Sequence, residues 1–208
     1  YNGFVQQDVE LQQNFWQQYI PNLDSKKIIL NVSRMHEQKN HPRLIEIFCS
    51  YCEQNQDAVL VLVGKEDPEI KAHLLSISKL SNDHGRIFYL GEQSNVLPFM
   101  AHANVMLFPS KWEGLPGAVL ESASIGTPVL ASDIPGVLEI AEQLPIVKHL
   151  SLNRDNTEWL TMLNFILSNP PEREKAKLEF RQSVFQLEFN VKQLYVLYHC
   201  VCCVFRCV

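Results

Sequence analysis

Short, nearly continuous apolar runs recur along the chain and leave room for a helix between them. They are rich in β-branched residues, and continuous apolarity is typical of strands buried on both faces, as in parallel sheets. The runs cover residues 27–33, 58–64, 86–91, 104–110, 127–132 and, more weakly, 145–150. The pattern therefore predicts a parallel sheet of about six strands.

Helical periodicity fills the gaps between these runs. Apolar residues of 41–54 recur at helical spacing and Pro42 suits a first turn. Asp67, followed by Pro68, is a suitable N-cap for the next helix. Helices are predicted over 41–54, 67–81, 116–125, 136–142, 157–168 and 172–189. Alternation of strands and helices indicates an α/β fold, a Rossmann-like doubly wound sheet with helices on both faces.

The chain divides into a leader, one domain and a tail. Residues 1–25 are interpreted as a linker with a leading helix, and 26–190 as the domain. Residues 191–208 form an apolar tail that ends in CVCCVFRCV. A terminal helix or strand, membrane-surface contact, a thiolate metal site and an unnatural chain end all remain open for this tail. The apolar run is too short to span a bilayer, which takes about 20 residues.

Composition narrows the compartment and the partners. A net charge of -5 excludes a general nucleic-acid binder, so any phosphate site must be local. The six cysteines are not spaced as a secreted disulfide framework, and the first residues lack the pattern of a signal peptide. We expect a cytoplasmic protein, with the inner face of the membrane as a second option.

Ligands of doubly wound sheets bind at the carboxyl ends of the strands. The loop SRMHEQKN follows the first apolar run and places Arg34 and Lys39 before a helix start, where backbone donors also favour an anion. Solvated loop cations are the alternative reading of this pair. His36, in the same loop, is interpreted as a solvated side chain.

A second loop, after the fourth run, carries two carboxylates around a helix start. Glu113 precedes Gly114, Pro116 and Gly117, and Glu121 lies one to two turns into the helix. Carboxylates accept hydrogen bonds from vicinal hydroxyls, and glycines allow close backbone approach. The layout suits a nucleotide sugar, with one glutamate on the ribose and the other on the sugar. We expect the basic pair and the two glutamates to converge on one pocket.

These stretches resemble the C-terminal, donor-binding domain of retaining glycosyltransferases of the GT-B fold, the group-one family of bacterial capsule and exopolysaccharide synthesis. YNG resembles the end of the family's linker, and SRMHEQKN its G-R-x4-K loop. FPSKWEGLPGAVLESASIGTPVLASDIPGVLEI is similar to its E-x7-E block. The sequence departs from the family's pattern at two places. Ser33 stands where the pattern has glycine, and Gly117-Ala118 stand where bulkier residues are common.

The resemblance implies a role for each matching residue. Arg34, Lys39 and Glu113 would be catalytic: the cations neutralise the diphosphate leaving group and Glu113 binds donor-sugar hydroxyls. Glu121 would take the ribose. The other donor-binding residues implied are Gly114, Leu115, Pro116, Gly117, Ala118, Gly64, Gln93 and Val96.

The implied reaction is retaining transfer of a sugar from a nucleoside diphosphate donor, a UDP-sugar, with no metal and no other cofactor. The implied partners are an N-terminal acceptor-binding domain, missing from this chain, and a lipid-linked or saccharide acceptor. We therefore expect the isolated chain to be inactive. The alternatives are a non-catalytic sugar-nucleotide-binding module and a GT-B sugar epimerase.

Overall fold

The computed structural model describes residues 4–21, 23, 26–80 and 85–187. The predicted tail at 191–208 lies outside these residues. Over the described part, no helix combines the length and apolarity needed to cross a membrane.

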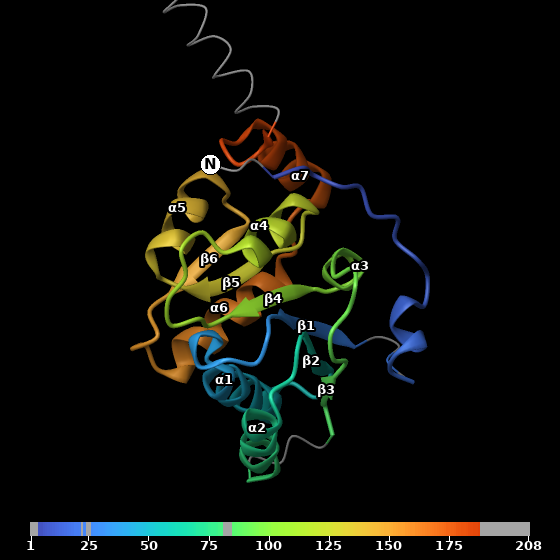
Figure 1. Ribbon diagram of the computed structural model, residues 1–208, viewed down its shortest axis with the longest axis vertical. Coiled ribbons are helices and arrows are strands. Elements are labelled where there is room, and N and C mark those ends of the chain that lie inside the picture. The colour runs from blue at the N-terminus through green and yellow to red at the C-terminus, as the bar shows by residue number, and fades with distance from the viewer. Residues whose placement is uncertain (1–3, 22, 24–25, 81–84, 188–208) are drawn as a thin grey trace, which may run out of the picture.

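One six-stranded, all-parallel sheet forms the centre of the domain, in the order β3-β2-β1-β4-β5-β6 (Figure 1). The strands are β1 (Lys27–Val32), β2 (Ala58–Val63), β3 (Ile87–Tyr89), β4 (Val105–Phe108), β5 (Val129–Ser132) and β6 (Val147–Leu150). Each lies within a predicted apolar run, which confirms the α/β prediction. The strand order reverses between β1 and β4, and such a switch point opens a crevice at the carboxyl ends of the strands.

The helices are α1 (His41–Gln54), α2 (Pro68–Leu80), α3 (Leu97–Ala101), α4 (Gly117–Ser124), α5 (Pro135–Gln143), α6 (Asn156–Ser168) and α7 (Arg173–Gln182). Two 3-10 helices, η1 (Phe15–Gln18) and η2 (Glu37–Lys39), complete the described elements. The sequence pattern missed α3 and η2, because elements this short carry no measurable periodicity.

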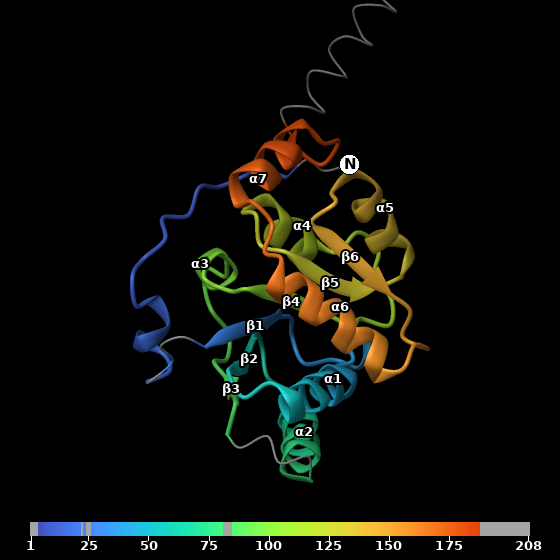
Figure 2. The same ribbon diagram turned by 180° about the vertical axis from the view of Figure 1, so that it is seen from behind.

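Helices cover both faces of the sheet, as predicted (Figures 1 and 2). Alternate residues of each strand point to opposite faces, so the strands divide into two apolar layers. One layer packs on α1, α2 and α6. The other packs on α3, α4, α5, α7 and the segment before β1. Burial on both faces explains why the strands read as continuous apolar runs.

Two predicted helix starts are confirmed and one predicted helix end is wrong. Pro42 lies in the first turn of α1, and the Asp67 carboxylate accepts the backbone N–H groups of Glu69 and Ile70. The helix predicted over 172–189 corresponds to α7, which ends at Gln182. Ser183 is extended there, and its hydroxyl donates to the carbonyl of Phe180, which closes a turn in place of a continued helix.

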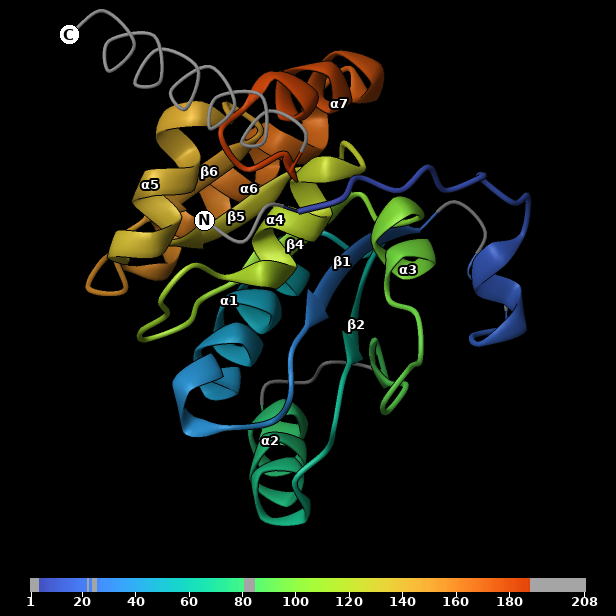
Figure 3. The ribbon, with the colours of Figure 1, turned by 45° about the horizontal axis from the view of Figure 1, so that its top comes forward.

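The segment before β1 runs along the domain from α7 past α3 (Figure 3). Phe4 pairs with the chain after α7, and its carbonyl accepts the N–H of Leu187. Further along, the Phe15 ring stacks on His102 and the Trp16 indole donates to the His102 carbonyl. Where a leading helix was predicted, the described residues contain only the four-residue η1.

A partly buried guanidinium fastens α7 to the start of β4 and β5. Arg173 donates to the carbonyls of Ala101 and Ala103 and lies 3.3 Å from the Thr127 hydroxyl. Burial lowers the pKa of Arg173. A partly buried charge held by several acceptors is costly to remove, because the acceptors lose their donor.

We therefore expect Arg173→Ala to lower the free energy of unfolding by about 2–4 kcal/mol, measured by urea denaturation. Arg181→Ala is the matched control: its side chain is 50% exposed and pairs with Asp8, so we expect a loss under about 1 kcal/mol. Equal losses in the two variants would contradict a special role for the Arg173 guanidinium.

Candidate functional site

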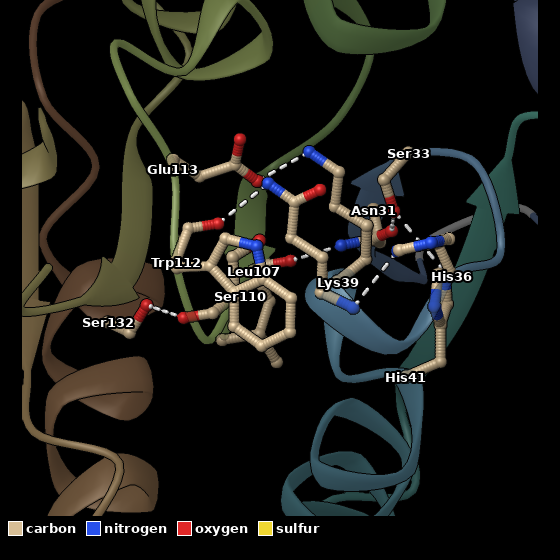
Figure 4. A network of polar contacts seen from close by, with 11 residues as sticks. Asn31, Ser33, His36, Lys39, His41, Leu107, Ser110, Trp112, Glu113 and Ser132 are labelled. Carbon is tan, nitrogen blue, oxygen red and sulfur yellow. Dashed lines mark hydrogen bonds and ion pairs between the residues drawn. The ribbon is translucent and has the colours of Figure 1, made fainter.

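Two loops meet at the switch point, one after β1 and one after β4. The backbone N–H of Lys111 donates to the Gln38 carbonyl at 2.8 Å. The Gln38 amide donates to the Trp112 carbonyl at 2.7 Å, and the Ser132 hydroxyl at the end of β5 donates to the carbonyl of Ser110 (Figure 4). The loop after β4 is therefore held from both sides.

The contact between these loops brings two predicted site residues together. The Lys39 ammonium lies 2.5 Å from a carboxylate oxygen of Glu113 (Figure 4). Their side chains are 16% and 10% exposed, respectively. The same ammonium lies 5.1 Å from the centre of the Phe108 ring. A lysine and a glutamate from distant parts of the chain thus form one partly buried ion pair.

Arg34 and His36 occupy the outer part of the β1 loop. Both are exposed, as predicted for His36. Arg34 makes no hydrogen bond or ion pair with another described residue, so its guanidinium is available to an anion. The His36 ring nitrogen Nδ1 accepts the N–H of Gln38 and thereby caps η2.

A buried polar chain, which the sequence reading missed, lies beneath this loop. His41 is 1% exposed, and its Nε2 lies 3.3 Å from the Ser33 hydroxyl. That hydroxyl donates to Asn31, whose amide donates to the Leu107 carbonyl in β4 (Figure 4). Ser33, where the family has glycine, therefore links α1 to the sheet. No local pattern marks His41 as buried, because its burial results from tertiary packing.

Two glycines of the E-x7-E block face open space. A side chain built at Gly114 or Gly117 would meet no atom within 4 Å, so the protein itself leaves room there. No side chain caps α4, whose first turn begins at Gly117. Its free N–H groups and the open glycines together suit a closely approaching anion.

Two other glycines set the position of the loops. Gly64 has φ +143°, and a Cβ there would lie 2.2 Å from the Ser33 carbonyl oxygen. This glycine, predicted to contact a donor, allows the loops after β1 and β2 to approach each other. At Gly136, the start of α5, a Cβ would lie 1.6 Å from the Gly114 carbonyl oxygen. The sequence reading assigned Gly136 no role.

Glu121 lines a pocket together with residues from two other parts of the chain. A pocket of about 470 Å³ is lined by Glu121, by residues 94–97, which include the predicted Val96, and by Phe4, Val5 and Gln7. Burial raises the pKa of Glu121. The predicted Gln93 does not line this pocket, and its amide donates to the Leu90 carbonyl. Neither Lys39 nor Glu113 lines this pocket, and the N-terminal segment supplies a wall that no motif indicated.

Other predicted donor-binding residues lie between Glu113 and Glu121 in the sequence. Leu115 is exposed, Pro116 is buried and Ala118 is partly buried. Within the described ranges, no three His, Cys, Asp or Glu side chains are grouped so as to hold a metal ion.

We expect Gly136→Ala to lower the free energy of unfolding by about 1–3 kcal/mol, because the new methyl group must displace the loop at Gly114. Gly117→Ala is the control: the same methyl group meets open space there. Thermal melts of both variants test this, and equal stability of the Gly136→Ala variant and the unchanged protein would contradict it.

The buried His41 should make the stability of the fold depend on pH. Burial, and then the charge of Lys39, lower the pKa of His41 from 6.5 to about 4. The unfolded chain binds a proton at this residue near pH 6.5, whereas the folded chain does not. The free energy of unfolding should therefore fall from pH 6.5 to pH 4, by at most about 3 kcal/mol from this residue.

Urea denaturation at several pH values measures that slope. His41→Gln should flatten it, whereas His73→Gln, on the exposed surface of α2, should leave it unchanged. An unchanged slope in the His41→Gln variant would show that other groups control the acid response.

The chain is similar to known proteins in sequence and in fold. The family model described as "Glycosyl transferases group 1" matches residues 12–182. The chain is 28% identical over 174 residues to the putative glycosyltransferase EpsF of Bacillus subtilis, covering 83% of this chain and 44% of that protein. It is 28% identical over 130 residues to a Campylobacter jejuni N,N'-diacetylbacillosaminyl-diphospho-undecaprenol alpha-1,3-N-acetylgalactosaminyltransferase, covering 62% and 32%.

The fold is shared with Anabaena HepE, whose crystal structure is a complex with UDP and glucose. The TM-score is 0.80 at 17% identity, and the match covers 96% of this chain and 56% of HepE. The chain thus spans roughly half, or less, of the length of these proteins. Because the family model covers most of it, the chain belongs to the group 1 glycosyl transferases, as the C-terminal domain of their GT-B fold.

Proposed function

We propose that this chain binds the nucleotide-sugar donor of a retaining glycosyltransferase in polysaccharide or glycoconjugate synthesis. The observation that carries the proposal is the Lys39–Glu113 contact at the β1/β4 switch point. It pairs a cation suited to phosphate with a carboxylate suited to sugar hydroxyls, at the edge of the sheet where ligands bind.

The diphosphate is assigned to the space between the β1 loop and the start of α4. Arg34 offers a planar fork to phosphate oxygens, and Lys39 a point charge. The N–H groups of Gly117 and Ala118 add partial positive charge at the helix start. When the sugar–phosphate bond breaks, negative charge grows on the departing diphosphate, and these groups stabilise it in place.

The two carboxylates are assigned to different hydroxyls. Glu113 accepts hydrogen bonds from the transferred sugar. Glu121 accepts them from the ribose in the pocket shared with Val96, and the base lies toward residues 92–96. That the HepE complexes contain UDP and UDP-glucose supports uridine as the base.

The acceptor is assigned to a second domain. The match covers 56% of HepE, so the remainder of that fold has no counterpart in this chain. The name of the Campylobacter jejuni relative specifies a diphospho-undecaprenol-linked saccharide, which supports an acceptor of that class. Residues 26–190 are proposed as the donor domain, with weak donor binding and negligible turnover on their own.

Calorimetric titration with UDP-, GDP- and ADP-glucose tests the donor assignment. We expect the UDP-sugar to bind best, and Arg34→Ala to weaken its binding about tenfold or more through the lost phosphate contact. Arg154→Ala is the control, since this exposed arginine lies near the start of α6 and pairs with Glu158. Binding that is absent for all three nucleotides, or unaffected by Arg34→Ala, would contradict the proposal.

A further inference from the structure

We propose that the Lys39–Glu113 ion pair makes this site discriminate against a nucleoside diphosphate that carries no sugar. The inference rests on the proposed function and adds to it a preference for the nucleotide sugar, the loaded donor, over the nucleoside diphosphate left after transfer, the spent nucleotide. Glu113 would then act before any sugar arrives, by controlling what Lys39 can bind.

The pair is enclosed and held in place. Its two charged atoms lie 2.5 Å apart, and little of either side chain reaches solvent. The centre of the Phe108 ring lies 5.1 Å from the ammonium. Gln38 fixes both loops, because its carbonyl and its amide each bind the loop that carries Glu113. Without a ligand, Lys39 is therefore already neutralised.

The neighbouring charges leave little attraction for a bare phosphate. The loops 33–40 and 109–116 contain three cations, Arg34, Lys39 and Lys111. Lys111 pairs with Glu37 at 3.0 Å, in a more exposed position than the Lys39 pair. Among the described residues, only Arg34 of these three lacks an ion pair. The first capture of an anion thus depends on Arg34 and the start of α4.

A loaded donor and a spent nucleotide interact differently with the Glu113 carboxylate. In a free nucleoside diphosphate, the outer phosphate is a monoester-like group with a charge of about −2 at pH 7. That charge attracts Lys39 but repels the adjacent carboxylate. In a nucleotide sugar, the outer phosphate carries one charge fewer, and the sugar presents hydroxyls that donate to Glu113. Only the loaded donor satisfies both members of the pair.

The consequence is a site that binds its substrate in preference to its nucleotide product. After transfer, the sugar hydroxyls are gone, the phosphate charge has grown and the Glu113 carboxylate faces it. The repulsion favours return of Lys39 to Glu113 and release of the nucleotide.

Titration of the 208-residue chain with UDP, UDP-glucose and UMP tests the inference, using Glu113→Gln and Glu37→Gln. Removing the Glu113 charge frees Lys39 and ends the repulsion, so we expect UDP to bind about tenfold more tightly. UDP-glucose should bind no more tightly than before, because the Glu113 hydroxyl contacts weaken. UMP, which lacks the outer phosphate, should be unaffected. Glu37→Gln, which breaks the exposed pair, should leave all three Kd values within about twofold.

Unchanged or weaker UDP binding by Glu113→Gln would overturn the inference, as would an equal gain for UMP. If the unchanged chain binds none of these ligands, the proposed function itself fails, so the two failures are distinguishable. Thermal melts establish that the variants fold. Should Glu113→Gln unfold, Glu113→Ala also removes the carboxylate and must show the same gain for UDP.

Discussion

The parallel pairing of β1 with β4 is the constraint on which the rest depends. Ile29 pairs with Val105 and Leu30 with Met106, so two strands far apart in sequence end side by side and point the same way. Their loops must then share one edge of the sheet. The hydrogen bonds of Gln38 to the opposite loop fix the spacing. Without that pairing, the loops that carry Lys39 and Glu113 would not lie at the same edge of the sheet, and the two charges would not form an ion pair.

Much of the fold could be predicted from the sequence because its signals are local. Buried strands show as apolar runs, and Asp67 shows as a cap. The site could be predicted in part, because Arg34 and Lys39 lie five residues apart in one loop and are therefore recognisable from the local sequence. What could not be predicted arises from contacts across the fold. His41 is buried although no local pattern marks it, and the pocket at Glu121 has a wall from the N-terminal segment. Short elements such as α3 lack the length that periodicity requires.

The two glutamates of the same motif occupy different electrostatic surroundings. Glu113 lies against an ammonium, whereas Glu121 lies in a pocket whose other lining residues carry no charge, and burial raises its pKa. In the sequence, Glu113 precedes the first residue of α4, Gly117, and Glu121 lies within that helix. An acidic chain can therefore present a local anion site, because the helix start and a few placed cations outweigh the net charge over short distances.

The contact between α5 and the E-x7-E loop has a consequence for how this site can change over evolutionary time. Gly136 touches the Gly114 carbonyl so closely that no side chain fits between them. The loop cannot sink toward α5 while that helix stays in place, and residue 136 cannot grow while the loop keeps its shape. A reshaped loop must then arise through paired substitutions, whereas changes at the open positions 114 and 117 can be sampled one at a time.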